Sequence, residues 1–289
     1  MLSIIICSSK EDISQVLRKN IEATVGITHE VIVINNSQRH YSMFSAYNEG
    51  VRRAKFDNLC FCHQDVRFHS GGWGKKIAAH LEDRDTGLIG LAGSFYLLDI
   101  PAPWFKAKPY FKNLIQSYRD SKRLANKYEL QKDEDVICVD GFFFCSRKDV
   151  FQKVRFDELY GGFHFYDLDI SMQIHESGYR IKVISDITVK HFSTGTMKKR
   201  WIHAAYMFYD KWKDHLPATI YPEIKIETQV RIKAFRDLLY LHFVNLVPLK
   251  EQTMKSGWRA LRLNIITAML LVPVKLLLNA VKSLFHIMH

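Results

Sequence analysis

Three short apolar runs alternate with helical stretches at the start of this sequence, and this alternation constrains the fold more than any other feature. The runs cover residues 2–7, 30–34 and 59–62, and each is continuous. Continuous runs of this length suit parallel strands that are covered on both faces. Segments 11–23 and 42–54 between them have the apolar spacing of helices. We therefore expect an α/β fold with a doubly wound, Rossmann-like mixed sheet flanked by helices, and ligands at the carboxyl ends of its strands.

The later part of the chain continues this pattern. Apolar runs predict strands over 88–94 and 136–146 and a strand pair within 181–191. A helix is expected over 167–177, because Gly178 follows it as a typical helix end.

Segment 101–134 is rich in Pro, Lys and aromatic residues and lacks clean periodicity. It is either an active-site flap or a surface insertion, and the insertion is the simpler interpretation.

The positive charge is concentrated at one end of the chain. The formal net charge is +11, and from residue 197 onward 15 Lys and Arg stand against 6 Asp and Glu. Such a surplus indicates a docking surface for a polyanion, either nucleic acid or an anionic membrane. Because the cations alternate with long aliphatic side chains and no nucleic-acid motif is present, we expect a membrane partner and no nucleic acid.

The C-terminal part predicts an amphipathic extension. The uncharged run 263–274 is shorter than the roughly 20 residues of a spanning helix. Beyond it, polar residues recur on one helical face, at Lys275, Asn279, Lys282 and His286. We expect a catalytic domain over 1–220 and a basic amphipathic extension over 221–289 that lies in the plane of a membrane; a helix packed on the catalytic domain is the alternative.

The cysteine content favours a reducing compartment. The five cysteines are odd in number and stand mostly in apolar runs, which is typical of buried free thiols. The opening residues also lack the basic segment of a signal peptide. We therefore expect a cytoplasmic protein bound peripherally to the inner face of the cell membrane.

Asp65 follows the apolar run 59–62, with His63 and Gln64 between them. A carboxylate at the end of a buried parallel strand lies where folds of this class bind phosphates and metals. Asp is also a common turn residue, so that alternative remains open.

Asp167 and Asp169 stand at the start of the expected helix 167–177. A carboxylate there either caps the first turn or faces a cleft. Gly161, Gly162 and several aromatic residues precede the pair, as in a loop that wraps a ligand or forms a packing corner.

His191 follows the apolar alternation 187–190. A histidine at a strand end is most often structural, and a neutral imidazole is also a common metal ligand.

In their order these motifs resemble family 2 glycosyltransferases over residues 1–200. The motifs are Cys7-Ser8-Ser9, Asn35-Asn36-Ser37, Asn48-Glu49-Gly50, His63-Gln64-Asp65, Gly141, Tyr166-Asp167-Leu168-Asp169 and His191. The resemblance implies a GT-A fold, a nucleotide-sugar donor and a divalent metal, Mn²⁺ or Mg²⁺.

The resemblance also implies roles for single residues. It assigns the donor to residues at the ends of the early strands and in the following helix: Ser8, Asn35, Asn36, Asn48, His63 and Asp65. Asp65 and His191 match metal ligands, and His63 stands where the family usually has an acid. Asp167 matches the general base, with Tyr166 in place of the usual Glu. Gly141, Tyr166 and Asp169 match positions that support the acceptor or the loop.

The expected activity is therefore the transfer of a sugar, with inversion, from a UDP-sugar to a glycan or lipid-linked acceptor in polysaccharide biosynthesis. A single carboxylate base on the far side of the sugar accounts for the inversion. The alternative is an inactive scaffold of the same fold, or a binding protein that docks on polyanions through its basic end.

Overall fold

The computed structural model describes residues 1–117, 125–193, 195 and 197–249. Its centre is a seven-stranded mixed sheet with the order β11-β14-β5-β13-β3-β1-β2. The strands of this sheet are β1 (Leu2–Ser8), β2 (His29–Asn35), β3 (Asn58–Cys62), β5 (Thr86–Gly90), β11 (Glu134–Val136), β13 (Phe143–Arg147) and β14 (Arg180–Val183). β1 is parallel to β2 and β3, whereas β13 runs antiparallel to both β3 and β5. The predicted α/β fold with a mixed sheet is confirmed.

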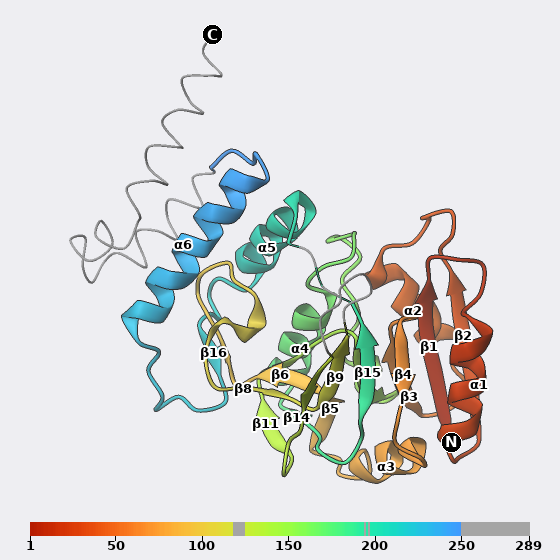
Figure 1. The fold of residues 1–289 in the computed structure, drawn as a ribbon. Helices are drawn as coiled ribbons and strands as arrows, with labels where there is room; N and C mark the ends of the chain where they lie inside the picture. Colours follow the sequence, from red (N-terminus) through yellow and green to blue (C-terminus); the bar gives the residue numbers. More distant parts are fainter. Residues whose placement is uncertain (118–124, 194, 196, 250–289) are drawn as a thin grey trace.

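Helices flank this sheet (Figure 1). They are α1 (Gln15–Thr24), α2 (Met43–Arg53), α3 (Trp73–His80) and α4 (Tyr166–Glu176). α1 starts later than expected, because the Ser14 side chain caps it by accepting a hydrogen bond from the Leu17 amide. α4 ends near Gly178, whose φ of +86° suits glycine.

Within the described residues, shorter strands form three smaller sheets. The first has the order β10-β9-β15-β4 and contains β4 (Val66–Phe68), β9 (Leu114–Ser117), β10 (Asn126–Tyr128) and β15 (Val189–Phe192). The second joins β12 (Cys138–Val139), β6 (Ala92–Ser94) and β8 (Tyr110–Lys112). The third pairs β16 (Ala218–Thr219) with β7 (Tyr96–Leu97). Two 3₁₀ helices, η1 (Trp104–Lys106) and η2 (Val150–Gln152), complete this part.

Two expected strands are broken into pieces. The run 88–94 divides into β5 and β6, and the run 136–146 contributes to β11, β12 and β13, with the pieces in different sheets. Apolar periodicity does not reveal such breaks, because both pieces of a run are buried alike.

Interpreting segment 101–134 as a surface insertion was wrong. It supplies β8, β9 and β10, and β9 pairs directly with β15. Strands of three or four residues are too short to show a periodic pattern in the sequence. Their pairing with distant strands shows instead that the segment is part of the sheets.

The described part of the extension packs on the rest of the chain. Its helix α6 (Thr228–Val244) lies beside α5 (Lys199–Lys211), which comes before the extension (Figure 1). The Arg231 guanidinium pairs with Asp99 at 3.1 Å, and the Tyr206 hydroxyl lies 2.7 Å from His242 Nε2. Leu238 on the same helix is buried. Within residues 1–117, 125–193, 195 and 197–249, none of the helices has the length and apolarity needed to cross a bilayer. The expected in-plane helix beyond residue 249 lies outside the described residues.

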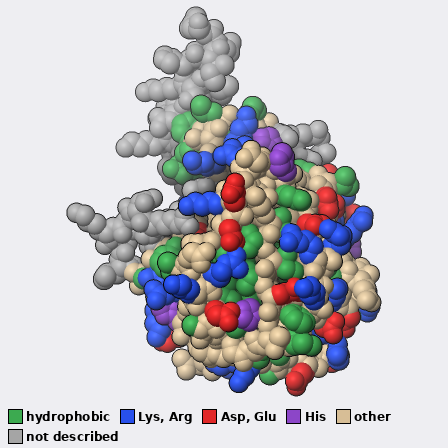
Figure 2. Space-filling view, turned by 90° about the vertical axis from the view of Figure 1, so that its right-hand side faces the viewer, with side chains coloured by type: hydrophobic (Ala, Val, Ile, Leu, Met, Phe, Trp, Pro, Cys, Tyr) green, Lys and Arg blue, Asp and Glu red, His purple; other side chains and the backbone are tan. Residues whose placement is uncertain are grey.

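The charges of the N-terminal part are mixed. Figure 2 shows the face beside α1 and β2, where cationic and anionic side chains are interspersed. This matches the small share of the net charge that falls before residue 197.

Candidate active site

Two strand pairings bring His191 to the turn after β3. His63, Gln64 and Asp65 form the turn between β3 and β4. β15 runs antiparallel to β4, with His191 opposite Val66, and the Phe192 amide donates to the Asp65 carbonyl oxygen at 2.9 Å. Backbone hydrogen bonds thus place two segments that are distant in the sequence side by side.

His63, Asp65 and His191 form a cluster that could hold a metal ion. One donor atom from each lies within 4.8 Å of the others. Asp65 Oδ1 lies 3.6 Å from His191 Nε2 and 3.8 Å from His63 Nδ1. His191 Nε2 is buried and accepts or donates no hydrogen bond among the described residues, which is the arrangement of a ligand atom. The Phe142 ring stacks on the His191 imidazole with centroids 4.8 Å apart and holds its orientation.

The Tyr166 hydroxyl orients His63. It donates to the Gly141 carbonyl oxygen at 3.0 Å and lies 2.8 Å from His63 Nε2. Because the single hydroxyl proton goes to Gly141, His63 Nε2 must carry the proton of the second hydrogen bond. This leaves the lone pair of Nδ1 facing Asp65. Burial, with a contribution from His191, lowers the pKa of His63 to about 4, so the imidazole is neutral and suited to a metal.

Gly141 is required by this contact. A Cβ atom at position 141 would lie 2.2 Å from the Tyr166 hydroxyl oxygen, which is closer than any real contact. The glycine therefore lets the tyrosine reach both the backbone and His63.

Asp140 precedes Gly141 in the chain, and Asp167 contacts the Gly141 backbone. The Asp167 carboxylate accepts hydrogen bonds from the amides of Gly141 at 2.8 Å and Leu168 at 3.0 Å. Burial and the negative charge of Asp140 raise the pKa of Asp167 to about 7. A carboxylate with this pKa is poised for proton transfer near neutral pH. The residue is only partly buried, in contrast to Asp169.

Asp169 makes different contacts from Asp167. It is fully buried, and its carboxylate accepts hydrogen bonds from Trp212 Nε1 and Gln173 Nε2, both at 2.8 Å. Lys211 Nζ lies at the same distance from Oδ1. These bonds tie α4 to α5 and its end.

The predicted donor residues fall into two groups. Ser8 is buried and its hydroxyl lies 3.0 Å from Gln64 Oε1, which joins the end of β1 to the turn that carries Asp65. Asn35 and Asn36 lie at the end of β2, which is next to β1. There the backbone amide of Asn36 donates to the Ser8 carbonyl oxygen at 2.8 Å. These residues lie at adjacent strand ends.

Asn48 has a structural connection. Its Nδ2 atom donates to the Phe156 carbonyl oxygen and to Glu158 Oε1, both at 2.8 Å, and its Oδ1 atom accepts from the Phe156 amide at 3.1 Å. The side chain therefore anchors the loop that follows η2, and its contact with the donor stays a prediction.

Asp140 and Gln64 are residues that the sequence reasoning missed. Asp140 accepts hydrogen bonds from Trp104 Nε1 at 2.9 Å and from the Phe142 amide at 3.1 Å. The dipeptide Asp140-Gly141 inside an apolar run is a turn signal, and it could have revealed a break in the strand at this position.

The comparisons with solved structures give distant likenesses. S. aureus TarS 1-349 in complex with UDP is 12% identical, with 90% of this chain and 78% of that chain covered and a TM-score of 0.49. GalNAc-T7 with UDP, GalNAc and Mn²⁺ is 12% identical, with 88% and 56% covered and a TM-score of 0.47. A197 from STIV is 16% identical, with 67% and 86% covered and a TM-score of 0.39. This chain thus spans little more than half of the GalNAc-T7 structure.

A family comparison is more direct. No curated protein matches the chain. The model of the glycosyltransferase-like family matches residues 3–216, which include the sheet, the His63, Asp65 and His191 cluster and Asp167. Because this match covers most of the chain, the protein belongs to the glycosyltransferase-like family.

Proposed function

We propose that the protein transfers a sugar from a UDP-sugar to a hydroxyl group of a glycan or lipid-linked acceptor, with inversion at the anomeric carbon. The observation that carries this proposal is the convergence of the His63, Asp65 and His191 donor atoms within 4.8 Å, connected through Tyr166 to the helix that bears Asp167. Membership of the glycosyltransferase-like family supports the reaction class.

His63 Nδ1, Asp65 Oδ1 and His191 Nε2 would hold a divalent metal. Both imidazoles suit a ligand role, since His63 is neutral and His191 Nε2 is buried without a hydrogen bond among the described residues. A bound metal would stabilise the negative charge that develops on the diphosphate leaving group. We favour Mn²⁺ over Mg²⁺, because Mg²⁺ prefers an all-oxygen octahedral shell whereas two of these three ligands are nitrogens.

The ends of β1 and β2 would bind the nucleotide. Gln64 connects the end of β1 to the turn that carries Asp65, because its Oε1 accepts from the Ser9 backbone amide at 3.1 Å and its Nε2 donates to Ser9 Oγ at 2.7 Å. Asn35 is exposed beside them and can offer an amide to the edge of a base.

Asp167 would act as the general base. Its carboxylate would accept the proton of the acceptor hydroxyl as the oxygen attacks the anomeric carbon. The amides of Gly141 and Leu168 fix the carboxylate in position, so little reorganisation is needed during the proton transfer. The raised pKa keeps the carboxylate basic enough for this task at neutral pH.

Helices α5 and α6 would face a membrane that carries the acceptor. Large apolar side chains are exposed on and just after these helices, at Met207, Tyr240, Val244, Leu246 and Leu249. Together with the basic surplus after residue 197, they support a peripheral location on an anionic, cytoplasmic bilayer face.

The proposal is tested by the thermal stability of the full chain with UDP and with Mn²⁺, each alone and together. A ligand that binds only the folded state adds about 2.7 kcal/mol at 100 times its Kd. We expect a rise in Tm with UDP that needs a metal, and a larger rise with Mn²⁺ than with Mg²⁺. A Tm unchanged by UDP and Mn²⁺ together would favour the inactive scaffold.

A further inference from the structure

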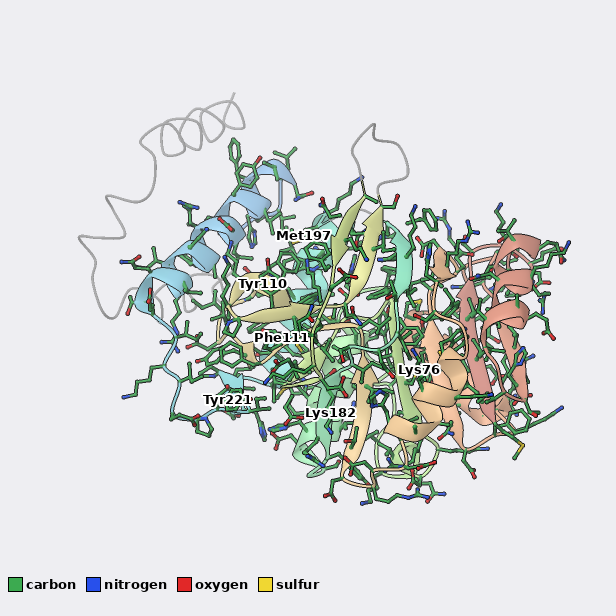
Figure 3. The ribbon with its side chains drawn as sticks, turned by 60° about the horizontal axis from the view of Figure 1, so that its bottom comes forward. Lys76, Tyr110, Phe111, Lys182, Met197 and Tyr221 are labelled. Carbon is green, nitrogen blue, oxygen red and sulfur yellow. The ribbon has the colours of Figure 1, made fainter. Side chains whose placement is uncertain are left out.

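Lys112 ends β8 inside a group of four aromatic rings, here called the Lys112 cage. Its Nζ atom lies 5.7 Å from the ring centroid of Trp104, 5.6 Å from Phe105, 5.2 Å from Tyr110 and 5.0 Å from Tyr128. Rings around a cation hold it by cation–π attraction and limit its movement. Figure 3 places Tyr110 on β8, between α6 and the strands of the large sheet.

The rings of the cage also brace one another. Trp104 meets Phe105 and Tyr110 edge-on, with centroids 5.4 Å and 6.0 Å apart. Trp104 is buried, whereas Phe105 is 41% exposed. The cage is therefore rigid on one side and open to solvent on the other.

A hydrogen bond connects the cage to the candidate active site. Trp104 Nε1 donates to Asp140 Oδ2 at 2.9 Å, and Asp140 adjoins Gly141, whose amide donates to Asp167. Asp140 acts electrostatically on both sides, since its charge raises the pKa of Asp167 and opposes the lowering of the Lys112 pKa by burial. Asp140 and Gly141 thus connect the cage to the carboxylate that would receive the acceptor proton.

The Lys112 ammonium has three N–H donors, and aromatic faces do not satisfy them as oxygen atoms do. In the described part of the chain, no carboxylate lies within ion-pair distance of Lys112 Nζ. Asp140, whose charge acts on Lys112, accepts its hydrogen bonds from Trp104 and Phe142 instead. An anionic oxygen of a ligand would complete this site, and the exposed Phe105 ring would cover the apolar face of a sugar.

We propose that Lys112 and its cage bind an anionic group of the acceptor, a phosphate or a carboxylate, and so select an acidic acceptor. This rests on the proposed function, because the acceptor must approach Asp167. Lys112 is then a specificity-determining residue, and the reaction joins a sugar to a glycosyl phosphate or a uronic acid unit.

The test compares three matched probes in the presence of UDP and Mn²⁺: glucose 1-phosphate, glucuronic acid and glucose. Binding to the full chain is measured by isothermal titration calorimetry. We expect at least one acidic probe to bind about tenfold more tightly than glucose, the discrimination that 1.4 kcal/mol supplies. The acidic probe that binds more tightly shows whether the site prefers a phosphate or a carboxylate.

Lys112→Met removes the charge and keeps an unbranched side chain in the cage. It should abolish the preference for the acidic probe and leave UDP and Mn²⁺ affinity unchanged, whereas Lys112→Arg should keep the preference. Lys153→Met is the control, because Lys153 Nζ also lies over a ring, that of Tyr179 at 4.8 Å, on an exposed surface.

Two results would overturn the proposal. The first is that the wild-type chain prefers neither acidic probe over glucose, or binds none of the three probes. The second is that Lys112→Met keeps the wild-type preference. Failure of the wild-type chain to bind UDP with Mn²⁺ would count against the proposed function, because that binding does not involve Lys112.

Discussion

The Tyr166 hydroxyl lies 2.8 Å from His63 Nε2, and this hydrogen bond connects the helix of the candidate base to the candidate metal ligands. Tyr166 stands where the resembled family has a Glu, so a neutral phenol here orients an imidazole. The arrangement sets the tautomer of His63 and directs Nδ1 toward Asp65.

Tyr166→Phe should therefore weaken metal binding while keeping the ring packing of α4. Loss of a hydrogen bond to a ligating histidine typically costs 10–100-fold in metal affinity. Calorimetric titration of Mn²⁺ with UDP present measures the change. Tyr179 lies just beyond the C-terminal end of α4, and Tyr179→Phe should bind as the wild-type chain does. Equal losses in both variants would contradict the specific role of Tyr166.

Asp65→Ala should abolish metal-dependent nucleotide binding and leave the fold intact. The Asp65 carboxylate is 17% exposed in a turn, and its charge raises the pKa of His63, so the buried His63 imidazole stays neutral without it. Calorimetry with UDP and Mn²⁺ measures the nucleotide binding, and circular dichroism checks that the variant is folded. Unchanged affinity in the variant would return Asp65 to the role of a turn residue.

Asp167→Asn should keep donor affinity and lower turnover by about 10²–10⁴, the usual contribution of positioned proton transfer. The amide preserves the shape of the side chain and loses its basicity. In the wild-type chain, turnover should rise with pH through about 7, where Asp167 becomes deprotonated. Turnover assays of Asp167→Asn and Asp169→Asn decide the assignment: an inactive Asp169 variant beside an active Asp167 variant would show that the roles are exchanged.

Asp167→Asn should gain stability relative to the wild-type chain as the pH rises from 5 to 8. The pKa of Asp167 is about 7 when folded and about 3.9 when unfolded, so the folded chain holds the extra proton between these values. The contribution of Asp167 to the free energy of unfolding therefore falls as the pH rises from about 4 to 7. We expect the difference in Tm between Asp167→Asn and the wild-type chain to be at least about 2–4 °C more favourable to the variant at pH 8 than at pH 5, the equivalent of 1 kcal/mol. An equal change at both pH values would contradict the raised pKa.

Asp140→Asn should move the acidic limb of the pH–activity profile to lower pH. Removing this negative charge makes deprotonation of Asp167 easier, although burial, the largest cause, still holds its pKa above the ordinary value. The measurement is kcat/KM as a function of pH. Asp149→Asn is the control, because Asp149 pairs with Arg147 and not with the candidate active site. It should leave the pH profile unchanged.

The segment from residue 259 to 289 should bind anionic bilayers peripherally. Its cations each add roughly 1 kcal/mol near such a surface, and its aliphatic face adds area-dependent affinity, so attachment should weaken with salt. Flotation of the full chain and of a truncation after Lys255 with neutral and anionic liposomes measures this. Equal flotation of both chains would refute it, and an insoluble truncation would instead indicate a helix packed on the catalytic domain.

The sequence alone determined the strand and helix alternation, because continuous apolar runs and helical spacing are local properties. The strands β1, β2 and β3, the helices α2 and α4 and the end of α4 near Gly178 were predicted on this basis and are confirmed. The family was also predicted from the order of the motifs and is confirmed.

Only the tertiary structure decided which of these residues meet. His191 reaches Asp65 through the pairing of β15 with β4, and Lys112 reaches the vicinity of Asp140 through β8, a strand of three residues in a segment without periodicity. Such short strands carry no pattern of their own, because hydrogen bonds to distant segments hold them in place. The raised pKa of Asp167 likewise depends on burial and on Asp140, and neither property belongs to the residue in the unfolded chain.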